Sequence, residues 1–155
     1  MKTLKKAFAK TTLGTLEIEY DDFVRAIHFV EVSGEIKNDS ITEPGLSCIK
    51  QLNEFFRGER KTFDLPIKID GTAFQKSVWN KLREIPYGET RSYGEIAAAL
   101  GNPKSARAVG NACNRNPMLI VVPCHRVVGK DGSMTGFAAG LERKRKLIDL
   151  EKVNI

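Results

Sequence analysis

The chain has 155 residues, of which 41% are hydrophobic and 28% are charged. This length and composition predict one or two small domains with an apolar core, and they exclude a disordered chain. No segment approaches the roughly 18 consecutive apolar residues of a membrane span, and residues 1–10 lack the apolar region of a secretion signal. We therefore expect no membrane contact. The sequence has three widely spaced cysteines, Cys48, Cys113 and Cys124, which argue against a disulfide framework and predict a cytoplasmic protein.

The formal net charge of +6 is unevenly distributed. Residues 1–69 hold 11 basic and 11 acidic side chains, whereas residues 70–155 hold 14 basic and 8 acidic ones. No acidic residue lies between Glu95 and Asp131, a segment that contains Lys104, Arg107, Arg115, Arg126 and Lys130. A basic surface of this kind suits a polyanion such as nucleic acid, and a basic surface without a nucleic-acid partner is the alternative.

The first 45 residues are predicted to be mainly strand. Residues 16–20 alternate apolar and charged side chains and residues 24–30 form a second apolar run, so the two are expected to pair as a hairpin. Residues 46–56 carry apolar side chains at helical spacing. Residues 61–69 alternate but contain a proline, which predicts an edge strand or an extended linker. The boundary is expected after this segment, with residues 1–69 as an N-terminal α/β domain and residues 70–155 as a second domain.

The second half is predicted to be mostly helical. Residues 74–85 place apolar side chains on one face of a helix. A capping box formed by Ser92 and Glu95 opens a short helix, and a new helix is expected to start near Lys104. Two short helices joined by a tight glycine-containing turn are typical of a helix-turn-helix, and a helix hairpin without a DNA role is the alternative. A final helix is predicted at about residues 140–151.

Cys124 is the residue most suited to chemistry. It follows an apolar run and precedes His125 and Arg126, and nearby cations favour the thiolate, which is the nucleophilic form. A general base and an orienting carboxylate would complete such a site. A buried small side chain is the alternative for this cysteine, and Cys48 and Cys113 occupy positions expected to lie in the core.

Metal binding is not expected. The sequence holds no Cys-x-x-Cys or His-x-x-x-His pair, and His28 has no ligand-like neighbours along its strand. Glycine-rich phosphate-binding and dinucleotide-binding motifs are also absent from the sequence.

The segment from Pro123 to Val127 resembles the active-site motif of the O6-alkylguanine-DNA alkyltransferases, also called methylated-DNA–protein-cysteine methyltransferases. Further positions stand at the family's spacing: Ser92-Tyr93, Arg107 to Gly110, Asn116-Pro117, Leu141 to Lys144, and Glu151. The strong match covers about residues 74–151, whereas the first 70 residues match in size and layout alone. The resemblance implies an N-terminal α/β domain with a small antiparallel sheet and a helix, followed by a mostly α-helical C-terminal domain with the helix-turn-helix, which binds DNA and transfers the alkyl group.

This resemblance implies a single-turnover repair reaction without a cofactor or a metal. Cys124 would take the alkyl group from O6 of a guanine that is flipped out of the duplex, and would keep it as a thioether. His125 would accept the thiol proton through a water, and Glu151 would orient His125. Asn116 would brace the loop before the nucleophile.

The resemblance also implies contacts with double-stranded DNA. Arg107 would fill the gap that the flipped base leaves, and Tyr93 would rotate the target 3′ phosphate and donate its hydroxyl to guanine N3. The carbonyls of the nucleophile and of Val127 would accept hydrogen bonds from the guanine amino group, and the N–H of Ala138 would donate to O6. Three more residues are expected at the DNA: Ser92, Lys104 and Arg126.

Two departures from the family pattern leave the accepted alkyl groups open. The loop before the last helix usually ends in two glycines in the family, whereas this chain has Ala139 before Gly140, and Phe137 replaces a frequent tyrosine. The sequence does not decide whether O4-alkylthymine is also a substrate. The zinc ligands found near the N-terminus of some relatives have no counterpart, and a monomer is expected.

Two other functions fit parts of the pattern. A non-enzymatic helix-turn-helix DNA binder is the first, but such relatives carry tryptophan at the position of Cys124. A cysteine hydrolase is the second, but its base usually lies far along the chain from the nucleophile, not next to it as His125 does.

Overall fold

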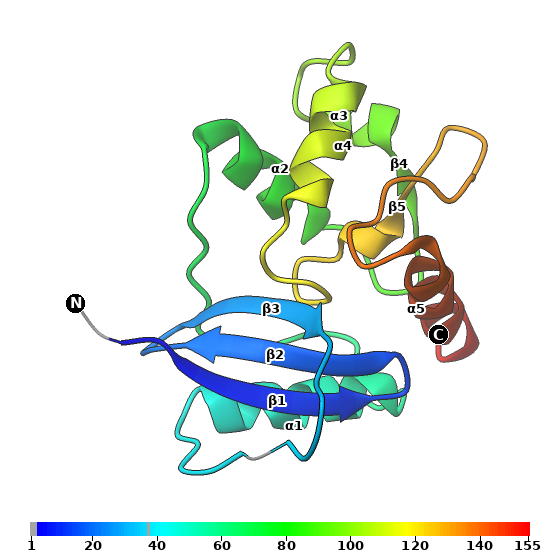
Figure 1. The fold of residues 1–155 in the computed structure, drawn as a ribbon. Helices are drawn as coiled ribbons and strands as arrows, with labels where there is room; N and C mark the ends of the chain where they lie inside the picture. The colour runs from blue at the N-terminus through cyan, green and yellow to red at the C-terminus, as the bar shows by residue number, and fades with distance from the viewer. Residues whose placement is uncertain (1–2, 37) are drawn as a thin grey trace. The chain divides into compact units, whose positions relative to one another are not determined.

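The computed structural model describes residues 3–36 and 38–155 of the chain. These residues belong to two compact units, Met1–Ile69 and Asp70–Ile155, and Figure 1 shows the elements of each. In the described part, no helix is both long and apolar enough to cross a membrane.

The first unit is built on a three-stranded antiparallel sheet of order β1-β2-β3, formed by β1 (Lys5–Thr11), β2 (Gly14–Tyr20) and β3 (Val24–Val30). The pairing of β2 with β3 confirms the predicted hairpin. The sequence pattern did not locate β1, because its buried side chains are the small Ala7 and Ala9, which give a weak apolar alternation.

Helix α1 (Gly45–Phe56) covers one face of this sheet (Figure 1). The helix buries Cys48, Leu52 and Phe55 at helical spacing, and β2 buries alternate side chains such as Ile18. The chain enters α1 close to Tyr20, because a Cβ atom at Gly45 would lie only 2.6 Å from the Tyr20 ring. The predicted helix is therefore confirmed, and its amphipathic face forms the core of the first unit.

Residues 61–69 form an extended segment with minimal pairing to β3. Val24 N donates to Pro66 O over 2.7 Å, and Lys68 N donates to Val24 O over 3.1 Å. Proline has no N–H to extend the ladder, so the pairing is limited to a single parallel bridge between Val24 and Ile67.

The second unit contains four α-helices among its described residues: α2 (Ala73–Leu82), α3 (Tyr93–Ala99), α4 (Ala106–Asn114) and α5 (Leu141–Val153). Trp79 on α2 donates its indole N–H to Ala112 O on α4 over 2.9 Å, which joins the two helices through a buried hydrogen bond. The predicted capping box of α3 is present, with Ser92 and Glu95 each bonded to the other's backbone N–H.

Helices α3 and α4 form the predicted helix-turn-helix. Helix α3 ends before Gly101, whose φ of 83° reverses the chain at a position that favours glycine. Helix α4 starts at Ala106, two residues later than the expected start near Lys104.

Two short parallel strands, β4 (Arg91–Ser92) and β5 (Val127–Val128), pair with each other. β4 leads directly into α3, and β5 directly follows the single 3-10 turn η1 (Cys124–Arg126). This pairing holds the cysteine motif beside the start of the helix-turn-helix.

Candidate active site

Asn116 braces the loop that leads to Cys124. Its side-chain Oδ1 accepts from Met118 N over 2.9 Å, and its Nδ2 donates to Val122 O over 2.8 Å. The Val122 carbonyl also accepts from Cys124 N over 2.8 Å. The amide side chain thus connects both ends of the loop, and the carbonyl that it bonds also accepts from the backbone of Cys124.

Cys124 begins η1 and is 3% exposed. Burial raises the pKa of the Cys124 thiol to about 11, although a hydrogen bond with Asn116 and the charge of Lys144 act in the opposite direction. Burial of the sulfur therefore opposes the thiolate that the sequence analysis expected beside these cations. Cys48 and Cys113 are also free and buried, and burial raises the pKa of each to about 12.

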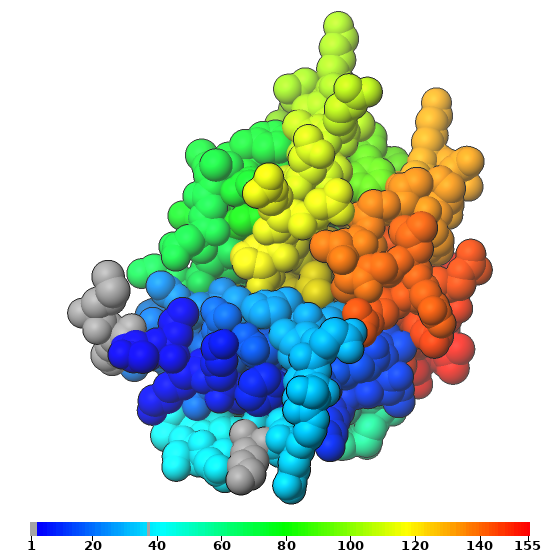
Figure 2. Space-filling view, in the orientation of Figure 1, coloured from blue at the N-terminus to red at the C-terminus, as the bar shows by residue number. Residues whose placement is uncertain are grey.

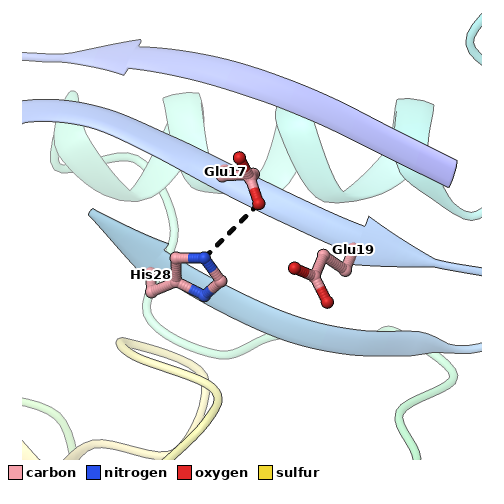
Figure 3. Close-up of side chains that lie close together, drawn as sticks. All are labelled: Glu17, Glu19 and His28. Atoms are coloured by element: carbon pink, nitrogen blue, oxygen red, sulfur yellow. Dashed lines mark ion pairs between the residues drawn. The ribbon is translucent and has the colours of Figure 1, made fainter. Parts of the chain in front are cut away.

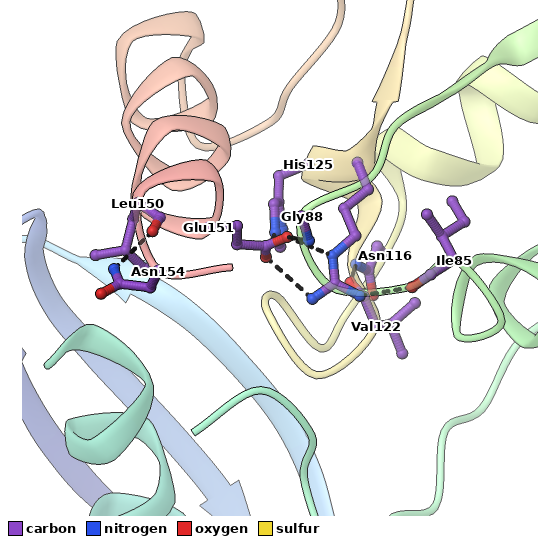
Figure 4. Close-up of polar contacts among 9 residues, drawn as sticks. Ile85, Gly88, Asn116, Val122, His125, Leu150, Glu151 and Asn154 are labelled. Carbon is purple, nitrogen blue, oxygen red and sulfur yellow. Dashed lines mark hydrogen bonds and ion pairs between the residues drawn. The ribbon is translucent and has the colours of Figure 1, made fainter. Parts of the chain in front are cut away.

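Glu151 on α5 receives four hydrogen bonds in a buried cluster (Figure 4). Its Oε1 accepts from Arg126 Nε over 2.8 Å and from Gly88 N over 3.0 Å. Its Oε2 accepts from Arg126 Nη2 over 3.0 Å and lies 2.5 Å from His125 Nε2. Burial by itself raises the pKa of Glu151, but the hydrogen bonds from His125 and Arg126 overcome it and lower the pKa to about 2.

His125, which follows Cys124 in the chain, is completely buried. Burial lowers the pKa of His125 despite the Glu151 carboxylate, so the ring is neutral near pH 7. An ionised carboxylate can only accept, so Nε2 carries the proton and donates it to Glu151. Nδ1 is then a lone-pair acceptor, and among the described residues it has no hydrogen-bond partner.

Arg126 lies elsewhere than the sequence analysis expected. It was expected at the DNA, whereas its guanidinium is buried. Two of its nitrogens donate to Glu151, and Nη1 donates to Ile85 O over 2.7 Å. A planar guanidinium suits such a bidentate contact with a carboxylate. The side chain therefore supports Glu151 instead of facing a phosphate.

Lys144 is a buried cation that the sequence analysis did not select as a site residue. Its Nζ donates to Thr135 O over 2.6 Å and to the Tyr93 hydroxyl over 3.3 Å, and Tyr93 donates to the same Thr135 carbonyl over 2.9 Å. Burial lowers the pKa of Lys144 and raises the pKa of Tyr93. Lys144 lies within a run of basic residues on the last helix, which is typical of a solvated surface, so its position in the family pattern was noted but no role was assigned to it.

The other predicted DNA contacts divide into exposed and buried groups. Arg107 and Lys104 are exposed in the first turn of α4 and just before it, in a segment that projects from the second unit (Figure 2). Ala138 is also exposed, in the loop before α5. Ser92 is half-buried and accepts from Glu95 N as the cap of α3, and Val127 is buried in β5.

Three possible metal ligands lie together in the first unit (Figure 3). The ligand atoms of Glu17, Glu19 and His28 all lie within 4.8 Å of one another. The sequence analysis found no such neighbours for His28, because antiparallel pairing places β2 residues beside β3 across the sheet. His28 Nε2 lies 3.4 Å and Lys6 Nζ 3.5 Å from Glu17 Oε1. Glu17 therefore already has a lysine and an imidazole as neighbours, and we assign no metal to the cluster.

Comparisons with known proteins cover both units. Residues 73–153 match the family described as 6-O-methylguanine DNA methyltransferase, DNA binding domain. A methylated-DNA–protein-cysteine methyltransferase of Methanosarcina acetivorans is 50% identical over 135 residues, which are 86% of this chain and 85% of that protein. The constitutive methylated-DNA–protein-cysteine methyltransferase of Bacillus subtilis is 45% identical over 155 residues, and the match covers 94% of each chain.

Solved structures are similar over nearly the whole chain. The crystal structure of a Mycobacterium tuberculosis O6-methylguanine methyltransferase matches with a TM-score of 0.83 and 37% identity, over 99% of this chain and 95% of that one. A crystal structure of Mycobacterium tuberculosis OGT in complex with DNA matches with a TM-score of 0.84 and 42% identity, over 95% of this chain and 92% of that one.

Proposed function

Because this chain belongs to the 6-O-methylguanine DNA methyltransferase family, we propose that it repairs DNA by moving the alkyl group of O6-alkylguanine onto Cys124. The observation that carries the proposal is the geometry of His125. Its buried ring directly follows the only cysteine at the motif, donates from Nε2 to Glu151, and leaves Nδ1 as an acceptor. A neutral imidazole held in this tautomer is a base for a protonated thiol.

The proposed reaction exchanges one bond for another. The sulfur of Cys124 forms a bond with the alkyl carbon while the bond from that carbon to guanine O6 breaks, and the electron pair stays on the guanine. The thiol proton passes through a water to His125 Nδ1, which has no hydrogen-bond partner among the described residues. Glu151 then stabilises the resulting imidazolium, because its ionised carboxylate already accepts from Nε2. No turnover follows, since the thioether is stable.

Tyr93 and Lys144 are proposed to serve the leaving guanine. The Tyr93 hydroxyl donates to Thr135 O in the free protein and can turn to donate to guanine N3. Lys144 Nζ donates to the same hydroxyl, so its positive charge would stabilise the negative charge that develops on the base and the phenol oxygen.

Base extrusion is proposed to depend on the exposed start of α4. Arg107 would occupy the space left in the stack and Lys104 would contact a phosphate, which fits binding that does not depend on sequence. The exposed backbone N–H of Ala138 would donate to O6 of the extruded guanine. Methylated O6 is thus the proposed target, and O4-alkylthymine is a second substrate to be measured.

We also propose that one copy of the chain suffices and that it works in the cytoplasm. All side chains assigned to the reaction lie within Asp70–Ile155, so a second copy need not contribute to the site. Three free cysteines suit a reducing compartment. Light scattering of the protein with and without duplex DNA tests the monomer, and fractionation of cells tests the location.

The experiment that tests the function is incubation with duplex DNA containing a labelled O6-methylguanine. We expect the intact protein to gain one methyl group in place of a hydrogen, and peptide mapping to locate it at Cys124. Cys124→Ala should remain unlabelled, and Cys113→Ala, a matched removal of a buried thiol, should be labelled. Binding without transfer would identify a non-enzymatic DNA binder, and repeated cleavage of an ester or amide would identify a hydrolase.

A further inference from the structure

A strained turn lies in the loop before Cys124. Ile120 has a φ of 75°, in the left-handed region that β-branched residues avoid because their side chains crowd the backbone. Val121 N donates to Leu119 O over 2.9 Å, which closes a three-residue turn around Ile120. A γ-turn with this sign of φ is rare and strained. Such a conformation persists only where its surroundings hold it.

The surroundings of Ile120 hold the turn from both sides. The side chain is 2% exposed, so rotating the backbone out of this conformation would remove it from the core. Val122 N donates to Met118 O over 3.0 Å, and the Asn116 side chain bonds the same two residues. The loop is therefore closed by three hydrogen bonds around the strained residue.

The turn is connected rigidly to the nucleophile. Val122 O accepts from Cys124 N over 2.8 Å, and Pro123 between them has φ of −83° and ψ of 65°, the values of an inverse γ-turn. Proline also fixes its own φ. The backbone conformation of Ile120 thus determines the position of Cys124.

We propose that Ile120 is a positioning residue for alkyl transfer, which rests on the proposed function of Cys124. Its buried side chain holds a left-handed turn that a residue without such an anchor would leave. The turn places the Val122 carbonyl, and through it the backbone and sulfur of Cys124, in line with the alkyl carbon. A small displacement of a reacting atom costs much of the rate, so the turn contributes to the chemical step and not to DNA binding.

Ile120→Ala and Ile120→Gly separate the backbone from the side chain. Both lose the anchor, but alanine still disfavours a φ of 75° whereas glycine adopts it freely. We expect the maximal single-turnover rate of methyl transfer to fall about a hundredfold in Ile120→Ala and about tenfold in Ile120→Gly. The DNA concentration for half-maximal rate should stay unchanged in both, and Ile120→Val should retain most of the rate.

Thermal melting supplies the control. Ile120→Gly should melt at a higher temperature than Ile120→Ala, whereas Ile148→Gly, at a buried isoleucine inside α5, should melt below Ile148→Ala. If the side chain matters only for packing, Ile120→Gly should transfer methyl no faster, and melt no higher, than Ile120→Ala. That result would overturn the proposal. A loss confined to DNA affinity would also overturn it.

A failure of the proposed function has a different signature. Wild-type protein would then transfer no methyl group at all. Labelling of Cys124 by iodoacetamide, a small alkylating agent that needs no DNA, would still distinguish both variants from the wild type if Ile120 positions the sulfur. Equal labelling of all three would contradict the positioning role regardless of the substrate.

Discussion

At the residue scale, one carboxylate determines the charges around Cys124. Glu151 accepts from two nitrogens of Arg126, from His125 and from Gly88 N, so its charge is compensated although the residue is 1% exposed. The positive charge of Arg126 is balanced by this contact, and burial, which outweighs the opposite effect of the Glu151 carboxylate, keeps His125 neutral. Neither neighbour of the cysteine therefore supplies the positive charge that would stabilise a thiolate, and the thiol must lose its proton during the reaction.

The first prediction concerns the reactivity of the free thiol. Because burial raises the pKa of Cys124 to about 11, the rate of its labelling by iodoacetamide should keep rising from about pH 7 to about pH 10. Labelling followed by peptide mass spectrometry measures this profile, with Cys124→Ala as the blank. A plateau below about pH 8 would show a stabilised thiolate and would contradict the prediction.

The second prediction separates Arg126 from the DNA contacts. Arg126→Ala leaves the buried Glu151 carboxylate with half its donors, so the free energy of unfolding should fall by about 3–5 kcal/mol. Denaturant unfolding measures this loss. Lys104→Ala, at an exposed cation, should leave the stability unchanged but weaken duplex binding and its dependence on salt. If Arg126→Ala keeps the wild-type stability and loses as much affinity for duplex DNA as Lys104→Ala, the prediction is wrong and Arg126 contacts DNA.

At the element scale, the two ends of helix α4 differ in how well their exposed cations suit contact with DNA. Helix α4 buries Val109, Ala112 and Cys113 against its own unit and exposes Arg107 near its start and Arg115 at its end. The N-terminal end of a helix directs unpaired N–H groups outward, which suits contact with phosphate. The start of α4 is thus the end that fits a DNA backbone, and the pairing of β4 with β5 ties this element to the cysteine motif.

The third prediction tests this polarity of α4. Arg107→Ala should lose the repair of O6-methylguanine in duplex DNA far more than the reaction with the free modified base, because extrusion costs a few kcal/mol only in the duplex. The ratio of the two second-order rate constants measures the effect. Arg115→Ala is the matched control, with the same change at the other end of the helix and an unchanged ratio expected. Equal losses on both substrates would assign Arg107 to the pocket or to folding.

At the scale of the whole molecule, the two units carry different kinds of polar groups. The first unit places its charges in partly exposed ion pairs such as that of Arg60 with Glu54, which contribute little to stability. The second unit buries a histidine, an arginine, a lysine and a glutamate. Stability should therefore depend on pH mainly through the second unit, and Trp79, the only tryptophan of the chain, reports on that unit.

The fourth prediction gives the sign of this pH dependence. Burial lowers the pKa of folded His125, so only the unfolded chain takes up this proton near its ordinary pKa of about 6.5, and the free energy of unfolding should fall as the pH drops from about 7 to about 5. Glu151, with a folded pKa of about 2, should add a further loss below about pH 4.

Unfolding followed by Trp79 fluorescence across this range measures both losses. His125→Gln should flatten the curve between about pH 7 and pH 5 while keeping the loss at lower pH. A wild-type curve that rises as the pH falls toward 5 would mean that His125 is protonated in the folded protein.

Elements whose signals are local could be predicted from the amino-acid sequence. The capping box of Ser92 and Glu95 and the hairpin of β2 and β3 depend on neighbours a few residues apart, and the cysteine motif is contiguous. Strand β1 was not located, because alanines can be buried without a strong apolar pattern.

The surroundings of the cysteine motif, in contrast, could not be predicted without the folded chain. Arg126 bonds a carboxylate 25 residues away, Lys144 is buried under Tyr93 and Thr135, and Ile120 adopts a conformation that its residue type disfavours. Each depends on contacts between distant segments, which local patterns do not specify. The raised pKa of Cys124 has the same origin, because burial, and not the identity of its neighbours in sequence, is its main cause.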